Sequence, residues 1–150
     1  MLSEILARAQ QRAQELGLSY EGALTPQEAW QVLELAPAAK LVDVRSRAEL
    51  DLVGRIPQAA HIEWAYYPDW SPNPDFVAQL KMQVDAESLV MFLCRTGARS
   101  NKAANAAHAA GYTEVYNVLE GFEGDTDHAK EQRGGINGWQ AAGLPWTNLG

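Results

Sequence analysis

Hydrophobic positions along the 150-residue chain follow two alternating patterns, one typical of amphipathic helices and the other of short buried strands. Helical spacing, or a capping signal that opens a helix, marks residues 1–17, 25–35, 46–54, 73–82, 102–110 and 136–142. Apolar or β-branched runs predict strands within residues 41–44, 56–62, 89–93 and 115–119. Residues 19–23 are predicted to form a linker, and the proline-rich residues 66–74 a loop. Alternating strands and helices predict an α/β fold, with helices on both faces of a mostly parallel sheet.

The most apolar predicted strand, residues 89–93, is followed at once by Cys94, the only cysteine in the chain. A lone cysteine is often just a buried apolar side chain, but a strand of that kind would continue into further apolar residues. Here the next six residues, 95–100, are small or polar and include two arginines. A turn between a strand and a helix directs backbone N–H groups and the positive end of the helix dipole at an anion. Because that environment favours a thiolate, Cys94 is predicted to be a nucleophile.

Composition and charge narrow the possible partners. A chain of this length, with 47% hydrophobic and 21% charged residues, is expected to form one globular domain. The net charge of −7 argues against nucleic acid or an anionic membrane as the main partner. A single cysteine excludes an intramolecular disulfide and fits a reducing, cytoplasmic location.

The N-terminal segment, residues 1–19, is predicted to be an amphipathic helix followed by a linker, ahead of a single domain over residues 20–150. Its apolar side chains recur at helical spacing: Leu2, Ile5, Leu6, Ala9, Ala13 and Leu16. Charged residues interrupt the segment, which lacks the continuous apolar stretch of a secretory signal. Packing of this helix on the domain is therefore favoured over a targeting or membrane-surface role.

Several motifs, in order along the chain, resemble those of the rhodanese family of sulfurtransferases. Residues 41–45 and 54–62, with Glu49 between them, resemble the first signature of the family. Residues 94–100 resemble its active-site loop. Residues 111–112, 119–121 and 138–145 resemble its C-terminal signature. Several motifs in the same order are more specific than any single one, and together they extend over about residues 22–147.

This resemblance implies a three-layer rhodanese-like fold with a central, mostly parallel five-stranded sheet. It also implies a thiosulfate sulfurtransferase, in which Cys94 is the catalytic residue that takes up sulfur as a persulfide and passes it to cyanide or a thiol. The loop is expected to bind the anionic substrate through Arg95, Thr96, Gly97, Ala98, Arg99 and Ser100. The implied partners are a small anionic sulfur donor such as thiosulfate and a cyanide, small-thiol or protein-thiol acceptor. No cofactor is expected, and without a second cysteine the sulfur must leave to an external acceptor.

Two alternatives stay open. Cysteine phosphatases and arsenate reductases of the rhodanese-like superfamily have a longer loop, whereas only four residues, 95–98, separate Cys94 from Arg99 here. This shorter loop should be cramped for phosphate and resembles the sulfurtransferase type. The other alternative is a rhodanese-like binding or sulfur-sensing module without turnover, although the usual sign of such a module is loss of the cysteine.

The chain departs from the family pattern by an inserted loop at about residues 122–134. Side chains of this insertion that could suggest a metal site are Asp125, Asp127, His128 and Glu131. They do not match the spacing of a calcium loop, so a solvated acidic loop is favoured and no metal is expected.

Other polar and aromatic residues have structural explanations. Asp43 and Arg45, at the end of a predicted strand, are expected to form a polar network near the base of the cysteine loop. His61 and His108 have no partner ligand at suitable spacing. The aromatic side chains near residues 64–70 either line the rim of the site or pack in the core, and the sequence does not separate these alternatives.

Overall fold

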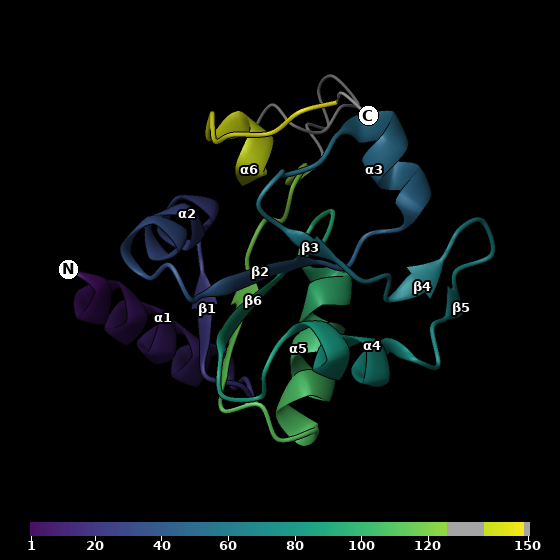
Figure 1. Ribbon diagram of the computed structural model, residues 1–150. Coiled ribbons are helices and arrows are strands. Elements are labelled where there is room, and N and C mark those ends of the chain that lie inside the picture. The colour runs from purple at the N-terminus through teal and green to yellow at the C-terminus, as the bar shows by residue number, and fades with distance from the viewer. Residues whose placement is uncertain (126–136, 149–150) are drawn as a thin grey trace.

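A five-stranded sheet forms the centre of the molecule (Figure 1). The computed structural model describes residues 1–125 and 137–148. Its central strands are β1 (Gly22–Leu24), β2 (Lys40–Asp43), β3 (Ala60–His61), β6 (Leu89–Leu93) and β7 (Glu114–Val118). They lie in the order β1-β7-β6-β2-β3, and each pairs with its neighbour in parallel. The predicted α/β class and the five-stranded parallel sheet are confirmed.

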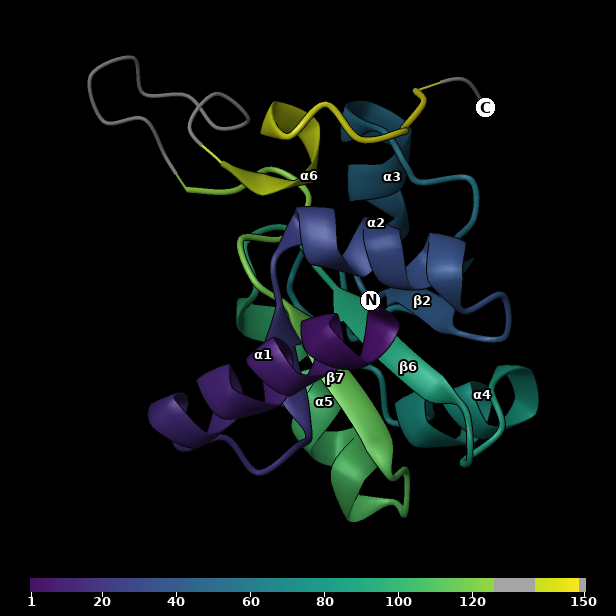
Figure 2. The same cartoon turned by 90° about the vertical axis from the view of Figure 1, so that its left-hand side faces the viewer.

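Helices cover both faces of this sheet (Figures 1 and 2). The described helices are α1 (Leu2–Leu16), α2 (Pro26–Leu35), α3 (Arg47–Val53), α4 (Phe76–Gln83), α5 (Ala98–Ala109) and α6 (Gly138–Ala141). Helices α1 and α2 lie on one face, and α4 and α5 lie on the other. The result is the three-layer arrangement that the resemblance implies.

Strand β6 contributes to both layers of the core because successive side chains of a strand point to opposite faces. Val90 and Phe92 pack with residues of α4 and α5. Met91 and Leu93 pack with residues of α1 and α2. All four are fully buried, which explains why this run is the most apolar predicted strand.

Two helices begin at the capping boxes that the sequence predicts. The Thr25 hydroxyl accepts from the Glu28 N–H, and the Glu28 carboxylate accepts from the Thr25 N–H. Ser46 and Glu49 make the same reciprocal pair at the start of α3. Each box satisfies two backbone donors that a helix start leaves without an intrahelical partner.

Three local predictions are wrong. Residues 19–23 were expected to be a linker, but Gly22–Leu24 form β1, which is stabilised by pairing with β7. The expected loop over residues 66–74 contains a small antiparallel hairpin of β4 (Ala65–Tyr66) and β5 (Ser71–Pro72). Helix α4 begins at Phe76 instead of Pro74, because Asn73 closes a turn by accepting from the Asp75 N–H.

The N-terminal helix α1 is part of the core. Ile5, Ala9 and Ala13 are buried, and Ile5 and Ala9 contact the layer that contains α2. Arg12 forms an ion pair with Glu28 of α2 at 2.9 Å. Within the described residues, no helix is long and apolar enough to cross a membrane.

Candidate active site

Cys94 follows the last residue of β6, a strand that lies between β2 and β7. Its side chain is 1% exposed and lies against the helical layer of α4 and α5. The Gly97 N–H donates to Cys94 Sγ at 3.0 Å. The Ser100 hydroxyl lies 3.3 Å from the same sulfur. Two donors therefore converge on the one thiol of the chain, and both stabilise negative charge on sulfur.

The turn between Cys94 and α5 depends on Gly97. Its φ of 111° lies in the left-handed region, where a side chain would be strained. The Gly97 carbonyl accepts from three donors: the Ser100 hydroxyl and the Asn101 N–H, each at 3.1 Å, and Asn117 Nδ2 at 3.3 Å. Helix α5 starts at the next residue, Ala98, so the positive end of its dipole faces the loop.

A second chain segment supports the loop from behind. The Phe122 N–H donates to the Cys94 carbonyl at 2.8 Å, and the Glu123 N–H donates to the Arg95 carbonyl at 3.0 Å. Between β7 and these contacts, Gly121 approaches so closely that a Cβ there would lie 2.6 Å from the Arg95 and Cys94 carbonyl oxygens. Residues 121–123, which include the start of the predicted insertion, therefore brace the cysteine loop through backbone contacts.

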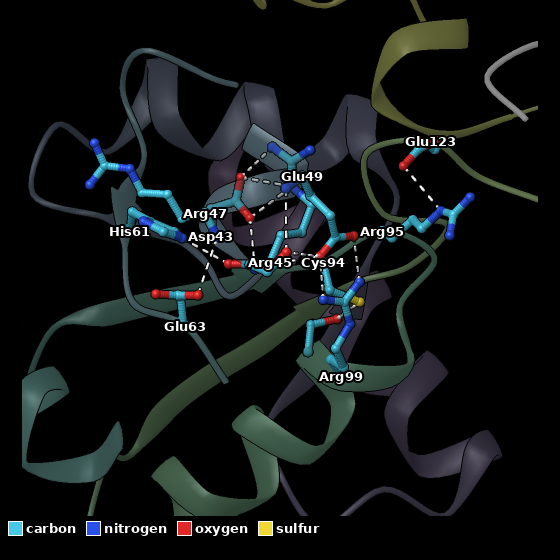
Figure 3. A network of polar contacts seen from close by, with 12 residues as sticks. Asp43, Arg45, Arg47, Glu49, His61, Glu63, Cys94, Arg95, Arg99 and Glu123 are labelled. Atoms are coloured by element: carbon cyan, nitrogen blue, oxygen red, sulfur yellow. Dashed lines mark hydrogen bonds and ion pairs between the residues drawn. The ribbon is translucent and has the colours of Figure 1, made fainter. Parts of the chain in front are cut away.

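Arg99 projects from α5 toward α3 (Figure 3). Its two terminal nitrogens donate to Glu49 at 2.6 and 2.8 Å, and its Cζ lies 4.9 Å from the ring centroid of Trp70. Burial alone would raise the pKa of Glu49, but the hydrogen bonds and charge of Arg99 outweigh it and lower that pKa. Burial likewise disfavours the charged form of Arg99, but Glu49, with a smaller contribution from Cys94, raises the Arg99 pKa. Both groups are therefore charged at neutral pH.

Arg95 points away from Arg99 and pairs with Glu123 through Nε at 3.1 Å (Figure 3). Its side chain is about half exposed. Among the described residues, none forms a hydrogen bond or ion pair with its two terminal nitrogens, which leaves them able to bind an anion. Thr96 is partly buried and Ala98 is exposed. Of the predicted loop residues, Gly97 and Ser100 are the ones that contact the Cys94 sulfur within the described part of the chain.

Asp43 and Arg45 form a buried ion pair at the carboxyl end of β2 (Figure 3). Arg45 donates Nε and Nη2 to the Asp43 carboxylate, at 2.9 and 2.6 Å, and Nη2 also donates to the Gly54 carbonyl. The guanidinium lies over the Phe122 ring at 4.1 Å. The pair thereby connects β2, the end of α3 and the segment that braces the cysteine loop.

The two histidines lie in different places. His61 Nε2 is 2.7 Å from the Arg45 carbonyl, so it joins the network at the end of β2. His108 lies in the last turn of α5, far along the helix from the cysteine loop. Among the described residues, no group of three His, Cys, Asp or Glu side chains can hold a metal ion. Asp127, His128 and Glu131 lie outside the described residues.

A pocket of about 200 Å³ opens beside the cysteine loop. It is lined by Ala48, Glu49, Leu52, Val53, Tyr67, Trp70, Arg95 and Glu123. A larger pocket, of about 550 Å³, lies at the amino ends of β2 and β3 and includes none of the loop residues. We take the smaller pocket as the mouth of the candidate site because Arg95 of the cysteine loop lines it, together with Glu49 and Trp70, the two residues that contact Arg99.

Comparison with known proteins identifies the family. A family model for the rhodanese-like domain matches residues 25–128. The chain therefore belongs to the rhodanese-like domain family. The family and its distant relatives support sulfur-transfer chemistry in general terms.

Individual relatives differ in what is known of them. The chain is 36% identical over 110 residues to an uncharacterized protein of Rickettsia conorii, with 72% of this chain and 82% of that protein covered. It is 30% identical over 122 residues to the thiosulfate sulfurtransferase GlpE of Actinobacillus succinogenes, with 81% and 86% covered. The crystal structure of Rv0390 from M. tuberculosis is similar, with a TM-score of 0.80, 44% identity and 87% and 100% covered.

The site contains residues whose roles the sequence did not reveal. Glu49 was recognised as a capping residue and part of a signature, but its ion pair with Arg99 was not anticipated. Glu123 lies at the start of the predicted insertion, and its ion pair with Arg95 was not anticipated. Asn117 was overlooked, although a polar side chain inside an apolar strand is itself a signal, because buried amides need hydrogen-bond partners.

Proposed function

We propose that this protein is a sulfurtransferase that carries sulfane sulfur as a persulfide on Cys94, with thiosulfate or a similar anion as donor. The observation that carries the proposal is the convergence of the Gly97 N–H and the Ser100 hydroxyl on Cys94 Sγ. These donors stabilise charge on the attacking sulfur and on the Cys94 thiolate when it leaves in the second step. The donor class is supported by the relationship to thiosulfate sulfurtransferases.

In the first half-reaction, the Cys94 thiolate attacks the outer sulfur of thiosulfate. A bond forms between Sγ and that sulfur, the sulfur–sulfur bond of thiosulfate breaks, and sulfite leaves with the electron pair. The free terminal nitrogens of Arg95 face the sulfonate at the mouth of the site. Arg99 adds positive charge nearby, although Glu49 balances much of it.

In the second half-reaction, an acceptor attacks the outer sulfur of the persulfide and Cys94 leaves as thiolate. With cyanide the product is thiocyanate, and with a thiolate it is the acceptor's own persulfide. The chain has one cysteine, so no second thiol of the same chain can resolve the persulfide. Splitting the transfer into two displacements is ordinary covalent catalysis.

The test is to incubate the purified chain with thiosulfate and record its intact mass. One added sulfur atom should appear, and cyanide should remove it and release thiocyanate. Cys94→Ala should show neither effect, while Met82→Ala, at an exposed residue on α4, should behave as wild type. If the wild type gains no sulfur but hydrolyses an aryl phosphate, the site is a phosphatase and the proposal is wrong. If it does neither but retains a binding partner, the fold serves as a binding module.

A further inference from the structure

The mouth of the site is bordered by apolar side chains that remain largely exposed in the described structure. Leu52 is 82% exposed on α3, and Tyr67 and Trp70 are 58% and 45% exposed on the β4–β5 hairpin. All three line the pocket of about 200 Å³ beside the cysteine loop. Water-exposed apolar side chains that gather around a concave site favour a ligand that covers them.

The charges around this pocket are paired. Arg99 is bound by Glu49 through two hydrogen bonds, and Arg95 is bound by Glu123. Each active-loop arginine therefore has a carboxylate within the lining of the same pocket. The pocket wall holds Glu49, Glu123 and Arg95, and Arg99, which pairs with Glu49, lies beside it, so the two ion pairs balance and no excess charge is left to select a charged acceptor body.

The size of the pocket limits what it can hold. An apolar protein cavity of about 150 Å³ is large enough for benzene. The pocket here is open and slightly larger, at about 200 Å³. It matches one ring or a short branched chain, and it is too small for a peptide segment or a helix to enter.

We propose that this pocket is an acceptor subsite for small thiols whose body is uncharged and apolar, about the size of one aromatic ring. This inference rests on the sulfur transfer proposed above. The acceptor thiolate attacks the outer sulfur of the Cys94 persulfide, and the bond between that sulfur and Sγ breaks. Cys94 leaves as thiolate with the electron pair, and the acceptor becomes a persulfide, so no external oxidant or reductant is needed. Leu52, Tyr67 and Trp70 cover the apolar body during this step.

The experiment separates sulfur loading from discharge. The chain is first loaded from thiosulfate, freed of donor, and checked by intact mass for one added sulfur atom. Single-turnover discharge is then followed with three acceptors: phenylmethanethiol, 2-mercaptoethanol and cyanide. The two thiols have similar acidity, so the difference between them reports the body of the acceptor. If the pocket buries one ring, the second-order rate constant of discharge should be about tenfold or more higher with phenylmethanethiol than with 2-mercaptoethanol.

Substitutions in the pocket test whether its side chains cause the preference for phenylmethanethiol. Leu52→Ser and Tyr67→Ser should reduce the preference for phenylmethanethiol several-fold, judged as a ratio to the cyanide rate of the same variant. Met82→Ser removes an equally exposed apolar side chain outside this pocket and should leave the preference intact.

Failure of the inference is distinct from failure of the proposed function. No added sulfur in the first step would overturn the sulfurtransferase itself. Normal loading and cyanide discharge, with equal rates for the two thiols or no effect of Leu52→Ser, would overturn only the subsite. The subsite is also overturned if Leu52→Ser leaves the thiol preference intact but disrupts a concentration-dependent dimer. The apolar surface would then be an interface with a second copy of the chain.

Discussion

Arg99 of the cysteine loop is bound to Glu49 by two hydrogen bonds, of 2.6 and 2.8 Å, although the two residues are 50 positions apart in sequence. Glu49 has a second task, because its carboxylate also accepts from the Ser46 N–H and caps α3. One side chain therefore connects the start of α3 to the start of α5. The direction of the Arg99 guanidinium is set by α3 as much as by its own loop.

Replacing Glu49 by Gln should destabilise the chain by about 1.5–3 kcal/mol at pH 7, the usual range for hydrogen bonds to a charged group. Glutamine still serves in a capping box, so the loss reports the pair with Arg99 more than the cap. Urea unfolding measures it. In an Arg99→Met background the same change should cost much less, and an equal cost in both backgrounds would contradict the assignment.

The stability that the Glu49 carboxylate contributes should fall as the pH is lowered. Arg99 and the Ser46 N–H hold the pKa of folded Glu49 below its ordinary value of 4.5, despite burial, which opposes this shift. The unfolded chain then binds the proton more tightly, so this contribution is fully present above about pH 4.5 and is lost as pH falls through the folded pKa. The stability difference between wild type and Glu49→Gln should shrink on acidification below pH 4.5. A constant difference from neutral to strongly acidic pH would contradict it.

Gly121→Ala should be among the most damaging small substitutions near the site. Its Cβ would lie 2.6 Å from the carbonyls of Cys94 and Arg95, and its φ of 65° is unfavourable for alanine. We expect a loss of about 2–4 kcal/mol in unfolding free energy, from the left-handed conformation and the backbone clash together, and slower sulfur loading because the loop must move.

Gly17→Ala is the matched control for this prediction. Gly17 has a similar φ of 70°, but a Cβ there meets no heavy atom within 4 Å. Gly17→Ala should lower the unfolding free energy by only about 1 kcal/mol, the cost of placing alanine in the left-handed conformation, and should leave the rate of sulfur loading unchanged. Equal losses for the two variants in a urea titration would show that the close approach at Gly121 is not a constraint.

The sequence predicted the parts of the fold that depend on local signals. Helices α2 and α3 begin at capping boxes that four residues define, and β6 is a run of apolar side chains long enough to stand out. Strand β1 has only three residues, and what makes it a strand is its pairing with β7, more than 90 positions away. The sequence of residues 22–24 does not indicate a pairing partner that lies so far along the chain.

The same distinction holds at the site. Cys94 and its loop were found because they are contiguous in sequence and their chemistry is local. The ion pair of Arg99 with Glu49 and the contact of Arg99 with Trp70 join separate segments and appear only once the chain is folded. Arg99 was expected to meet a substrate anion, and the structure shows that a carboxylate of the chain already lies beside it.

Asn117 should act on Cys94 through a shared hydrogen bond. The Ser100 hydroxyl has one proton but lies within reach of two acceptors, Cys94 Sγ at 3.3 Å and the Gly97 carbonyl at 3.1 Å. Asn117 Nδ2 reaches that carbonyl at 3.3 Å and the Asn101 N–H donates to it at 3.1 Å, so both of its lone pairs keep a donor when the hydroxyl turns to sulfur. In Asn117→Leu the Asn101 N–H still fills one lone pair of the carbonyl, and the hydroxyl then favours the other lone pair over the sulfur.

We therefore expect Asn117→Leu to slow alkylation of Cys94 by iodoacetamide at fixed pH by up to about 3-fold, a part of the worth of one hydrogen bond. Ser100→Ala removes the donor outright and should slow it by about 3- to 10-fold, and the double variant should be little slower than Ser100→Ala alone, because both changes act on the same donor to sulfur. Urea midpoints measured in parallel distinguish this effect from a general loss of stability. Multiplicative slowing in the double variant would mean that Asn117 and Ser100 act on the thiol independently, since two residues that share one donor cannot each remove it in turn.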